Sequence, residues 1–204
     1  VISPAANFNY SVSYLFNAGP FSHTGLKLDY AASEDLSLML AVTNGHAITS
    51  DIPNPSGETQ FGAQVGYKGQ FLNFIYGGVS PGIDDGLLND YTGGFDLTDS
   101  FYVGINAAYA YSEDDAAAGY QGAALYLQNS FSESLAIGLR PEFFSLTYDE
   151  LDDEDVTALT LTGNYTLDSN LTFIAELRYD DSEDGIIEGY PGEDLSTLTF
   201  AAVY

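Results

Sequence analysis

The decisive stretch of this chain reads Leu171-Thr172-Phe173-Ile174-Ala175-Glu176-Leu177-Arg178-Tyr179. Successive side chains of a β-strand point to opposite faces, so one face of this stretch carries Leu, Phe, Ala and Tyr. Glu176 and Arg178 fall on the other face, together with a threonine. The same alternation recurs in 134–147, where Arg140 and Glu142 take polar positions. An apolar face opposite a small, polar, sparsely charged face is typical of a membrane β-barrel with an apolar, lipid-facing exterior and a polar, water-filled interior.

The composition favours strands over helices and excludes several classes of function. The 204 residues include 16 Tyr and 13 Phe, and only four Lys and Arg against thirty Asp and Glu, for a net charge of -26. The absence of Cys excludes disulfides, thiolate metal sites and thiol catalysis. Because so acidic a chain repels phosphate, we expect no nucleic-acid partner.

Candidate strands follow one another along the whole chain. They are 7–17, 24–32, 35–43, 59–68, 71–79, 90–97, 101–111, 119–130, 134–147, 156–167, 171–180 and 195–204. Most are about 9–11 residues long, which is enough for a tilted strand to cross a bilayer, whereas no apolar run reaches the roughly 18 residues of a transmembrane helix. The sequence therefore predicts an all-β fold, a transmembrane up-and-down antiparallel β-barrel of about twelve strands formed by one domain, residues 1–204.

Short and long connections alternate between these strands. Tight turns are expected at 33–34, 69–70, 98–100, 132–133 and 168–170, with longer connections between them. Short turns on one rim and long loops on the other are the plan of outer-membrane barrels, with the short rim periplasmic. An even number of strands would place both termini on that side. A solenoid or a polar-faced soluble sandwich is an alternative, but the inward face rich in Thr and Asn favours the barrel.

Charged side chains on the inward face are predicted to line the lumen. They are Lys27, Asp29, Lys68, Arg140, Glu142, Glu176 and Arg178. Acidic and basic groups opposed across a lumen would create a transverse field that orients polar solutes. The same charges could instead brace the wall, and the sequence leaves both interpretations open.

Most acidic residues fall in or beside the long connections. The predicted acidic vestibule contains Asp149, Asp152, Asp153, Asp155, Asp180 and Asp184. Such a vestibule would concentrate cations, although a merely solvated acidic surface would have the same composition. Asp180-x-Ser182-x-Asp184-Gly185 begins like a calcium loop, but Pro191 stands where the loop requires Glu. We therefore expect no cofactor and at most weakly bound Ca²⁺ at these loops.

Three N-terminal motifs carry a family resemblance. They read Asn7-Phe8-Asn9-Tyr10-Ser11-x-Ser13-Tyr14-Leu15-Phe16, Gly19-Pro20-Phe21-Ser22-His23-Thr24-Gly25 and Val42-Thr43-Asn44-Gly45. This order resembles the OmpL-like β-barrel porin family of bacterial outer membranes. The resemblance implies passive pore function. Because members carry further strands before these motifs, it also implies an N-terminal portion with further strands ahead of Val1.

The predicted function is a porin that allows passive diffusion of small hydrophilic solutes or ions, with a weak cation preference from the acidic loops. The alternative is a non-conducting surface platform, which an inward-folded loop such as 44–58 would favour. No catalytic residue is expected, because nothing pairs His23 or His46 with a nucleophile. We therefore do not expect an enzyme.

The expected location is the bacterial outer membrane, in contact with its lipid and lipopolysaccharide. The C-terminal stretch 198–204 alternates apolar residues and ends on Tyr204. It looks like the strand signal read by the outer-membrane barrel assembly machinery, which is therefore an expected partner. A homo-oligomer is compatible with the sequence.

Overall fold

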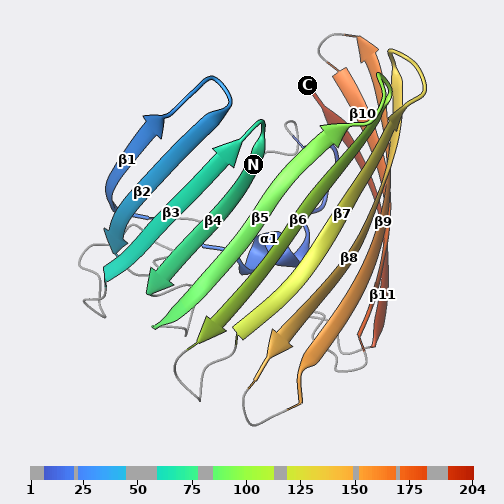
Figure 1. The fold of residues 1–204 in the computed structure, drawn as a ribbon. Helices are drawn as coiled ribbons and strands as arrows, with labels where there is room; N and C mark the ends of the chain where they lie inside the picture. The colour runs from blue at the N-terminus through green and yellow to red at the C-terminus, as the bar shows by residue number, and fades with distance from the viewer. Residues whose placement is uncertain are drawn as a thin grey trace.

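The computed structural model describes residues 7–20, 23–44, 59–77, 85–112, 119–148, 152–168, 171–182 and 193–204. They contain the helix α1 (Tyr14–Ala18) and the strands β1 (Gly25–Ala31), β2 (Leu36–Asn44), β3 (Thr59–Tyr67), β4 (Gln70–Gly77), β5 (Gly86–Asp96), β6 (Phe101–Ser112), β7 (Gly119–Ser130), β8 (Leu135–Thr147), β9 (Glu154–Asp168), β10 (Leu171–Asp181) and β11 (Asp194–Val203). All eleven strands form one antiparallel sheet in chain order (Figure 1). The predicted all-β, up-and-down antiparallel architecture is confirmed.

One predicted strand is wrong. Residues 7–13 are not in a strand, and the helix α1 follows them directly, so the strand expected over 7–17 does not form. The other eleven predicted strands correspond to β1 through β11. The start of β5 also differs, because this strand begins at Gly86 and therefore includes Asp90 well inside it.

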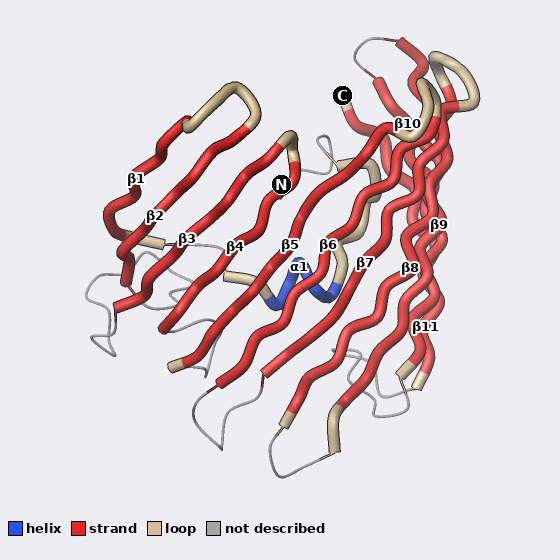
Figure 2. Tube along the Cα trace, in the orientation of Figure 1, coloured by secondary structure: helices blue, strands red, loops and turns tan. Residues whose placement is uncertain are grey.

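The short connections of the described sheet lie on one rim. Residues 32–35, 68–69, 97–100 and 131–134 join successive strand pairs there, at the top of Figure 1. In the turn at 68–69, Lys68 and Gly69 have φ values of 49° and 79°, the left-handed geometry of a two-residue hairpin turn. The strand β11 ends on the same rim, so the C-terminus lies beside the short turns (Figures 1 and 2). We call this rim the turn rim and the opposite one the loop rim.

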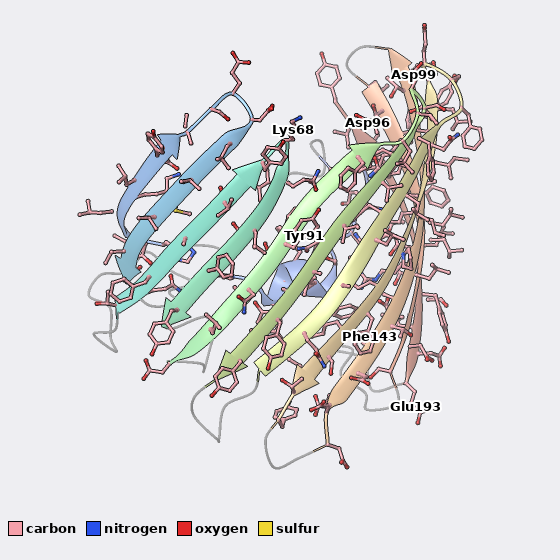
Figure 3. All side chains as sticks on the ribbon, in the orientation of Figure 1. Lys68, Tyr91, Asp96, Asp99, Phe143 and Glu193 are labelled. Atoms are coloured by element: carbon pink, nitrogen blue, oxygen red, sulfur yellow. The ribbon has the colours of Figure 1, made fainter. Side chains whose placement is uncertain are left out.

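The convex face of the sheet is apolar and exposed. In β9, the side chains of Leu159 and Leu161 are 47% and 46% exposed, whereas Thr160 between them is fully buried at 0%. Outward residues of the edge strands are more exposed still, with Leu26 at 82% and Phe200 at 75%. A soluble protein has the opposite polarity, since it buries its apolar side chains. Figure 3 shows this face along β7 to β9, with Phe143 projecting from β8.

The strands β1 and β11 are the two edges of the described sheet. Because eleven is odd and every pair is antiparallel, these two edge strands run in the same direction. Within the described residues no strand pair joins β1 to β11. A direct pairing of these edges would therefore be parallel, whereas an antiparallel closure needs an odd number of further strands between them.

The concave face of the sheet, called the lumen below, holds the residues before β1. The helix α1 lies against this face beside β6 and β7 (Figures 1 and 2). Its buried residue Leu15 belongs to an apolar cluster with Leu88, Tyr120, Phe144 and Val156. The largest apolar cluster of the described chain is thus inside the lumen. No helix in the described ranges is long and apolar enough to span a membrane.

The apolar convex face predicts a depth-dependent cost for a charged substitution. Leu161→Arg at the middle of β9 should lower the free energy of unfolding in lipid vesicles by about 2–4 kcal/mol, because arginine is costly at the bilayer midplane. Leu167→Arg, near the turn rim of the same strand, is the matched control and should cost at most about 1 kcal/mol. Equal costs at both positions, measured by denaturant unfolding, would contradict a lipid-facing convex surface.

Candidate functional site

Five polar side chains form a connected network on the lumenal face of β3 to β6. The strand register aligns Gln64, Asn73 and Asp90 across β3, β4 and β5. The amide of Gln64 donates to Asn73 Oδ1 at 2.7 Å, and Asn73 Nδ2 donates to Asp90 Oδ1 at 2.7 Å. Asn106 Nδ2 donates to Asp90 Oδ2 at 2.8 Å, and Thr92 Oγ1 donates to Asp90 Oδ1 at 3.3 Å. We call these five residues the Asp90 network, since every donor in it leads to this carboxylate.

An apolar row lies next to the Asp90 network on the same face. Leu88 precedes Asp90 by two residues in β5, and the register places Leu88 between Ile75 of β4 and Ala110 of β6. Tyr120 of β7 follows in the same row. Side chains two residues apart in a strand share a face. The lumen wall is therefore polar at Asp90 and already apolar at Leu88, the next lumenal residue toward the loop rim.

The helix α1 covers the β6 and β7 end of this apolar row. Its N-cap is Ser13, whose Oγ accepts from Phe16 N at 3.0 Å, and Gly19 and Pro20 follow the helix directly. An N-cap serine and a following Gly-Pro pair are ordinary start and stop signals for a short helix. Leu15 is 4% exposed within the apolar cluster. This burial explains why residues 14–18 leave the strand pattern and fold inward.

Two lumenal carboxylates bind backbone N–H groups of the segment 7–20, the N-terminal segment. Glu176 of β10 is 2% exposed, and its two carboxylate oxygens accept from Tyr10 N and Ser11 N at 2.9 Å each. Glu142 of β8 accepts from Leu15 N at 2.9 Å. Hydrogen bonds to a charged acceptor stabilise by about 1.5–3 kcal/mol each. These two acids therefore hold the N-terminal segment at both ends of the stretch 10–15.

Two lumenal guanidinium groups bind carbonyl oxygens of the same segment. Arg140 Nη1 donates to Ser11 O at 2.7 Å, and Arg140 Nη2 donates to Val12 O at 3.2 Å. Arg178 Nη1 donates to Val12 O at 2.7 Å, and its guanidinium also lies 4.8 Å from the centre of the Tyr14 ring. The arginines thus complement the glutamates, because they donate to backbone carbonyl oxygens of the segment, whereas the glutamates accept from its backbone N–H groups.

Further contacts continue this attachment toward the turn rim. Asn164 Nδ2 donates to Phe8 O at 2.9 Å, and Asn9 Nδ2 donates to Thr162 Oγ1 at 2.7 Å. A methyl group at Gly138 would collide with the Phe8 ring, so the glycine leaves room for it. Since Phe8 is near the turn rim and Leu15 is nearer the loop rim, the N-terminal segment runs down the lumen along β8 to β10.

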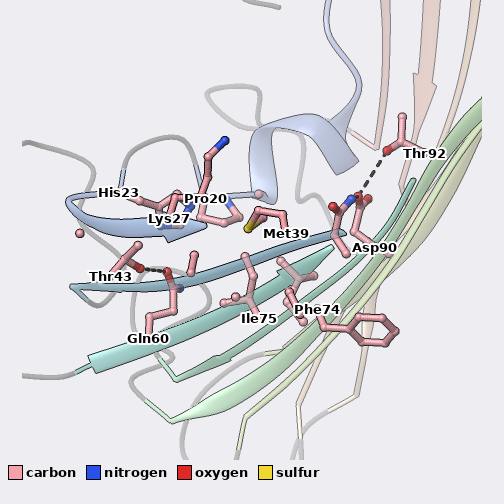
Figure 4. A pocket seen from close by; sticks show the side chains of 18 of the residues that line it. Pro20, His23, Lys27, Met39, Thr43, Gln60, Phe74, Ile75, Asp90 and Thr92 are labelled. Carbon is pink, nitrogen blue, oxygen red and sulfur yellow. Dashed lines mark hydrogen bonds between the residues drawn. The ribbon is translucent and has the colours of Figure 1, made fainter. Parts of the chain in front are cut away.

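An open cavity of about 480 Å³ remains between α1 and the wall formed by β1 to β6. Figure 4 shows the residues that line it, including Met39, Ile75 and Asp90 from the wall. Both Leu15 and Phe16 of α1 face the same cavity. A second cavity of about 460 Å³ lies between the N-terminal segment and β5 to β8. The segment is thus bound against β8 to β10, and open space remains along the rest of the described wall.

A family model described as "Putative beta-barrel porin-2, OmpL-like" matches residues 1–204. The chain belongs to this family. The match covers the N-terminal motifs and every strand, so the resemblance predicted from those motifs is confirmed. No curated protein matches the chain. Porin-like families are typically non-enzymatic, in keeping with the prediction of no catalytic site.

The structure of this porin-family chain places the predicted lumenal charges in two groups. Arg140, Glu142, Glu176 and Arg178 all point into the lumen, but they bind the N-terminal segment. Lys27 and Asp29 lie on β1, where Lys27 Nζ is 3.2 Å from Asp29 Oδ1 and both side chains are exposed.

Lys68 requires a correction, because it does not lie within a strand wall. It occupies the left-handed turn between β3 and β4, and its Nζ is 3.6 Å from Asp35 Oδ2 in the neighbouring turn. Figure 3 shows Lys68 at the turn rim, where Asp96 and Asp99 also lie. The strand β3 ends at Tyr67, so the inward alternation that predicted a lumenal Lys68 stops one residue before it.

Asp180 also departs from its prediction as a vestibule residue. It belongs to β10, is 2% exposed, and accepts from Arg178 Nε at 2.8 Å. Residues two apart in a strand share a face, so Arg178 draws this carboxylate into the lumen. The long connection expected to begin near Asp180 therefore starts later, after β10 ends at Asp181.

The remaining vestibule residues lie at the loop rim or outside the described residues. Asp152 and Asp153 directly precede β9, and Asp155 is the second residue of that strand. Asp149 and Asp184 are outside the described residues. Asp153 Oδ1 accepts from Tyr148 N at 3.2 Å. Among the described residues, no group of three or more His, Cys, Asp and Glu is arranged to hold a metal ion. Weak Ca²⁺ binding at these loops stays a prediction.

His23 lies at the loop-rim side of the cavity, just before β1, while His46 is outside the described residues. Loss of water around the imidazole lowers the pKa of His23, and a hydrogen bond with Gln60 opposes this only in part. Burial therefore favours the uncharged imidazole of His23.

Sequence reasoning missed the two features that organise this lumen. Asp90 was assigned to the edge of a long connection, because β5 was expected to begin at residue 90. The sequence also predicts a strand over 7–17, where the structure has an irregular stretch followed by the helix α1. Ser13 as an N-cap before Gly19 and Pro20 was the signal that could have identified the helix.

The carboxylate contacts predict that the N-terminal segment loosens when Glu176 is neutralised. Glu176→Gln turns one acceptor into a donor that faces the N–H groups of Tyr10 and Ser11. Amide hydrogen exchange at these two residues should become faster by about tenfold or more, because each lost charged hydrogen bond is worth about 1.5–3 kcal/mol. Glu133→Gln, in an exposed turn, is the control. Unchanged exchange in a folded Glu176→Gln barrel would show that other contacts hold the segment.

Proposed function

We propose that this chain is an outer-membrane porin that passes small hydrophilic solutes and ions along the β1 to β6 side of its lumen. The observation that carries this proposal is the division of the lumen. The N-terminal segment is bound along β8 to β10, and a cavity of about 480 Å³ remains beside β1 to β6, lined by Asn73, Asp90, Thr92 and Asn106 of the Asp90 network. A second cavity of about 460 Å³ lies between the segment and β5 to β8. Family membership supports a pore, and the cavity is the part of the lumen available to a solute.

We further propose a weak preference for cations. Among the described residues, the open side carries Asp90, Asp96 near the turn rim and the Lys27–Asp29 pair, so negative charge exceeds positive charge there. The whole chain carries a net charge of -26, which would raise the local concentration of cations at the pore entrance. The contribution of exposed loop acids should weaken with rising salt, since screening acts over about 8–10 Å at physiological ionic strength. Asp90 is deeper in the lumen and should be screened less.

The non-conducting platform remains the second candidate function, and one observation favours it. Charged side chains of β8 and β10 bind the N-terminal segment inside the lumen, as a permanent plug would be held. The loop 44–58, expected as the inward-folded element, lies almost entirely outside the described residues. An obstruction from the N-terminal segment would serve the same purpose.

The orientation in the membrane is part of this proposal. The C-terminus and Phe8 both lie near the turn rim, and short turns face the periplasm in outer-membrane barrels. Both ends of the described chain would then be periplasmic, with acidic loops outside, next to lipopolysaccharide. The alternating, exposed β11 that ends near Tyr204 supports recognition by the barrel assembly machinery.

Single-channel recording tests the proposed function. The refolded chain in a planar bilayer should give stable conductance steps, and its reversal potential in a KCl gradient should indicate a weak cation preference. Asp90→Asn should move that reversal potential toward zero, because it removes a lumenal carboxylate that has no ion-pair partner among the described residues. The control is Asp96→Asn on the same strand at the turn rim, which should have a smaller effect. A folded, heat-modifiable barrel without conductance would instead support the platform.

A further inference from the structure

We propose that the open side of the lumen contains a binding site for small organic cations that carry an ammonium group on a short apolar body. Asp90 is the anchoring carboxylate, and the row of Ile75 and Leu88 accommodates the apolar body. As a statement about transport this inference rests on the proposed function, since it names the solutes that would be held on their way through the lumen. As a statement about binding it can be tested without any conductance.

The first argument concerns the charge of Asp90. Its two oxygens accept three hydrogen bonds, two on Oδ1 and one on Oδ2. A carboxylate offers about four acceptor positions, so Oδ2 retains capacity for a donor that enters from the cavity. Ion pairs in the described part of the chain join Lys27 to Asp29, Lys68 to Asp35 and Arg178 to Asp180. Within that part, no basic side chain of the protein neutralises Asp90.

The second argument concerns the kind of cation. Asn73 and Asn106 turn their NH₂ groups toward Asp90, so they surround the carboxylate with donors. Inorganic divalent cations instead take a shell of several oxygen ligands, which these amides do not offer to the same point. An ammonium group needs only an acceptor and can complete its remaining hydrogen bonds with water. The Asp90 network therefore suits an organic ammonium better than a divalent metal ion.

The third argument concerns the apolar wall. Leu88 is on the same face as Asp90 at two residues' distance, and Ile75 is directly opposite Leu88 in the sheet. Phe16 of α1 and Tyr120 of β7 line the same cavity of about 480 Å³. A hydrocarbon body attached to the ammonium would be buried among these side chains, and the aromatic rings add an attraction for a cation. A carboxylate beside an apolar wall distinguishes such a ligand from an anion and from a hydrated inorganic ion.

Titration of n-pentylammonium into the refolded full-length chain in detergent micelles tests the site. Binding is measured by calorimetry and by chemical shifts, with pentanoate and 1-pentanol as anionic and neutral probes of equal length. We expect saturable binding of n-pentylammonium alone. Affinity should rise by about two- to fourfold per methylene from methylammonium to n-pentylammonium, since each buried methylene adds to binding.

Two variants assign the binding to this site. Asp90→Asn should weaken n-pentylammonium binding by about tenfold or more, because it removes a charge-assisted hydrogen bond. Asp96→Asn makes the same change on the same strand at the turn rim and should leave the affinity unchanged. Far-ultraviolet circular dichroism and heat-modifiability confirm that both variants are folded, and an Asp90→Glu variant should keep part of the affinity if Asp90→Asn does not fold.

The outcomes separate this inference from the proposed function. Equal, unsaturable binding of the three pentyl probes would overturn it, as would an affinity that Asp96→Asn lowers more than Asp90→Asn. Conductance without specific n-pentylammonium binding would leave the porin proposal standing and remove this site. Specific binding without conductance would retain the site and refute the porin proposal.

Discussion

The structure depends on one constraint, the need to pair every backbone N–H and C=O where water is absent. A lipid environment offers the backbone no hydrogen-bond partners, so spanning elements must satisfy each other. The eleven described strands do this by antiparallel pairing with their sequence neighbours, so the free edges of the described sheet are those of β1 and β11. The two-residue period of a strand then decides the rest. It turns leucines such as Leu159 and Leu161 outward and hides Thr160 and Thr162 inside.

Inside the sheet, four charged side chains bind a chain segment, and one of them, Arg178, also forms an ion pair with Asp180. Arg140, Glu142, Glu176 and Arg178 are buried or half-buried, and burying a charge is costly unless it finds hydrogen bonds. The backbone of residues 10–15 supplies those bonds, with N–H groups for the glutamates and carbonyls for the arginines. These four side chains bind the N-terminal segment, a role that neither the bracing interpretation nor the transverse-field interpretation included.

This attachment makes the lumen asymmetric. The segment is bound to β8, β9 and β10, and the wall of β1 to β6 carries the Asp90 network and its apolar neighbours beside open space. A barrel with a uniform polar lining would offer a solute only water and scattered polar groups. Here a carboxylate, its amide donors and a hydrocarbon surface converge on one cavity. The chain thus combines an exposed apolar outer face with an inner face that presents a carboxylate and apolar side chains to the same cavity.

The sequence by itself determined the strands, their inward and outward faces, the alternation of short and long connections, and the family. These depend on local rules, because a period of two residues and the turn residues between strands can be read without distant contacts. Only the tertiary structure decided that residues 14–18 form a helix in the lumen, that Lys68 stays at the turn rim, and that Asp90 has no basic partner among the described residues. The physical reason is that Leu15 gains its burial from Leu88 and Tyr120, and Ser11 gains its partners from Glu176 and Arg140, residues far along the chain. A local sequence pattern cannot predict these contacts, because they form only once the sheet has curved around the segment.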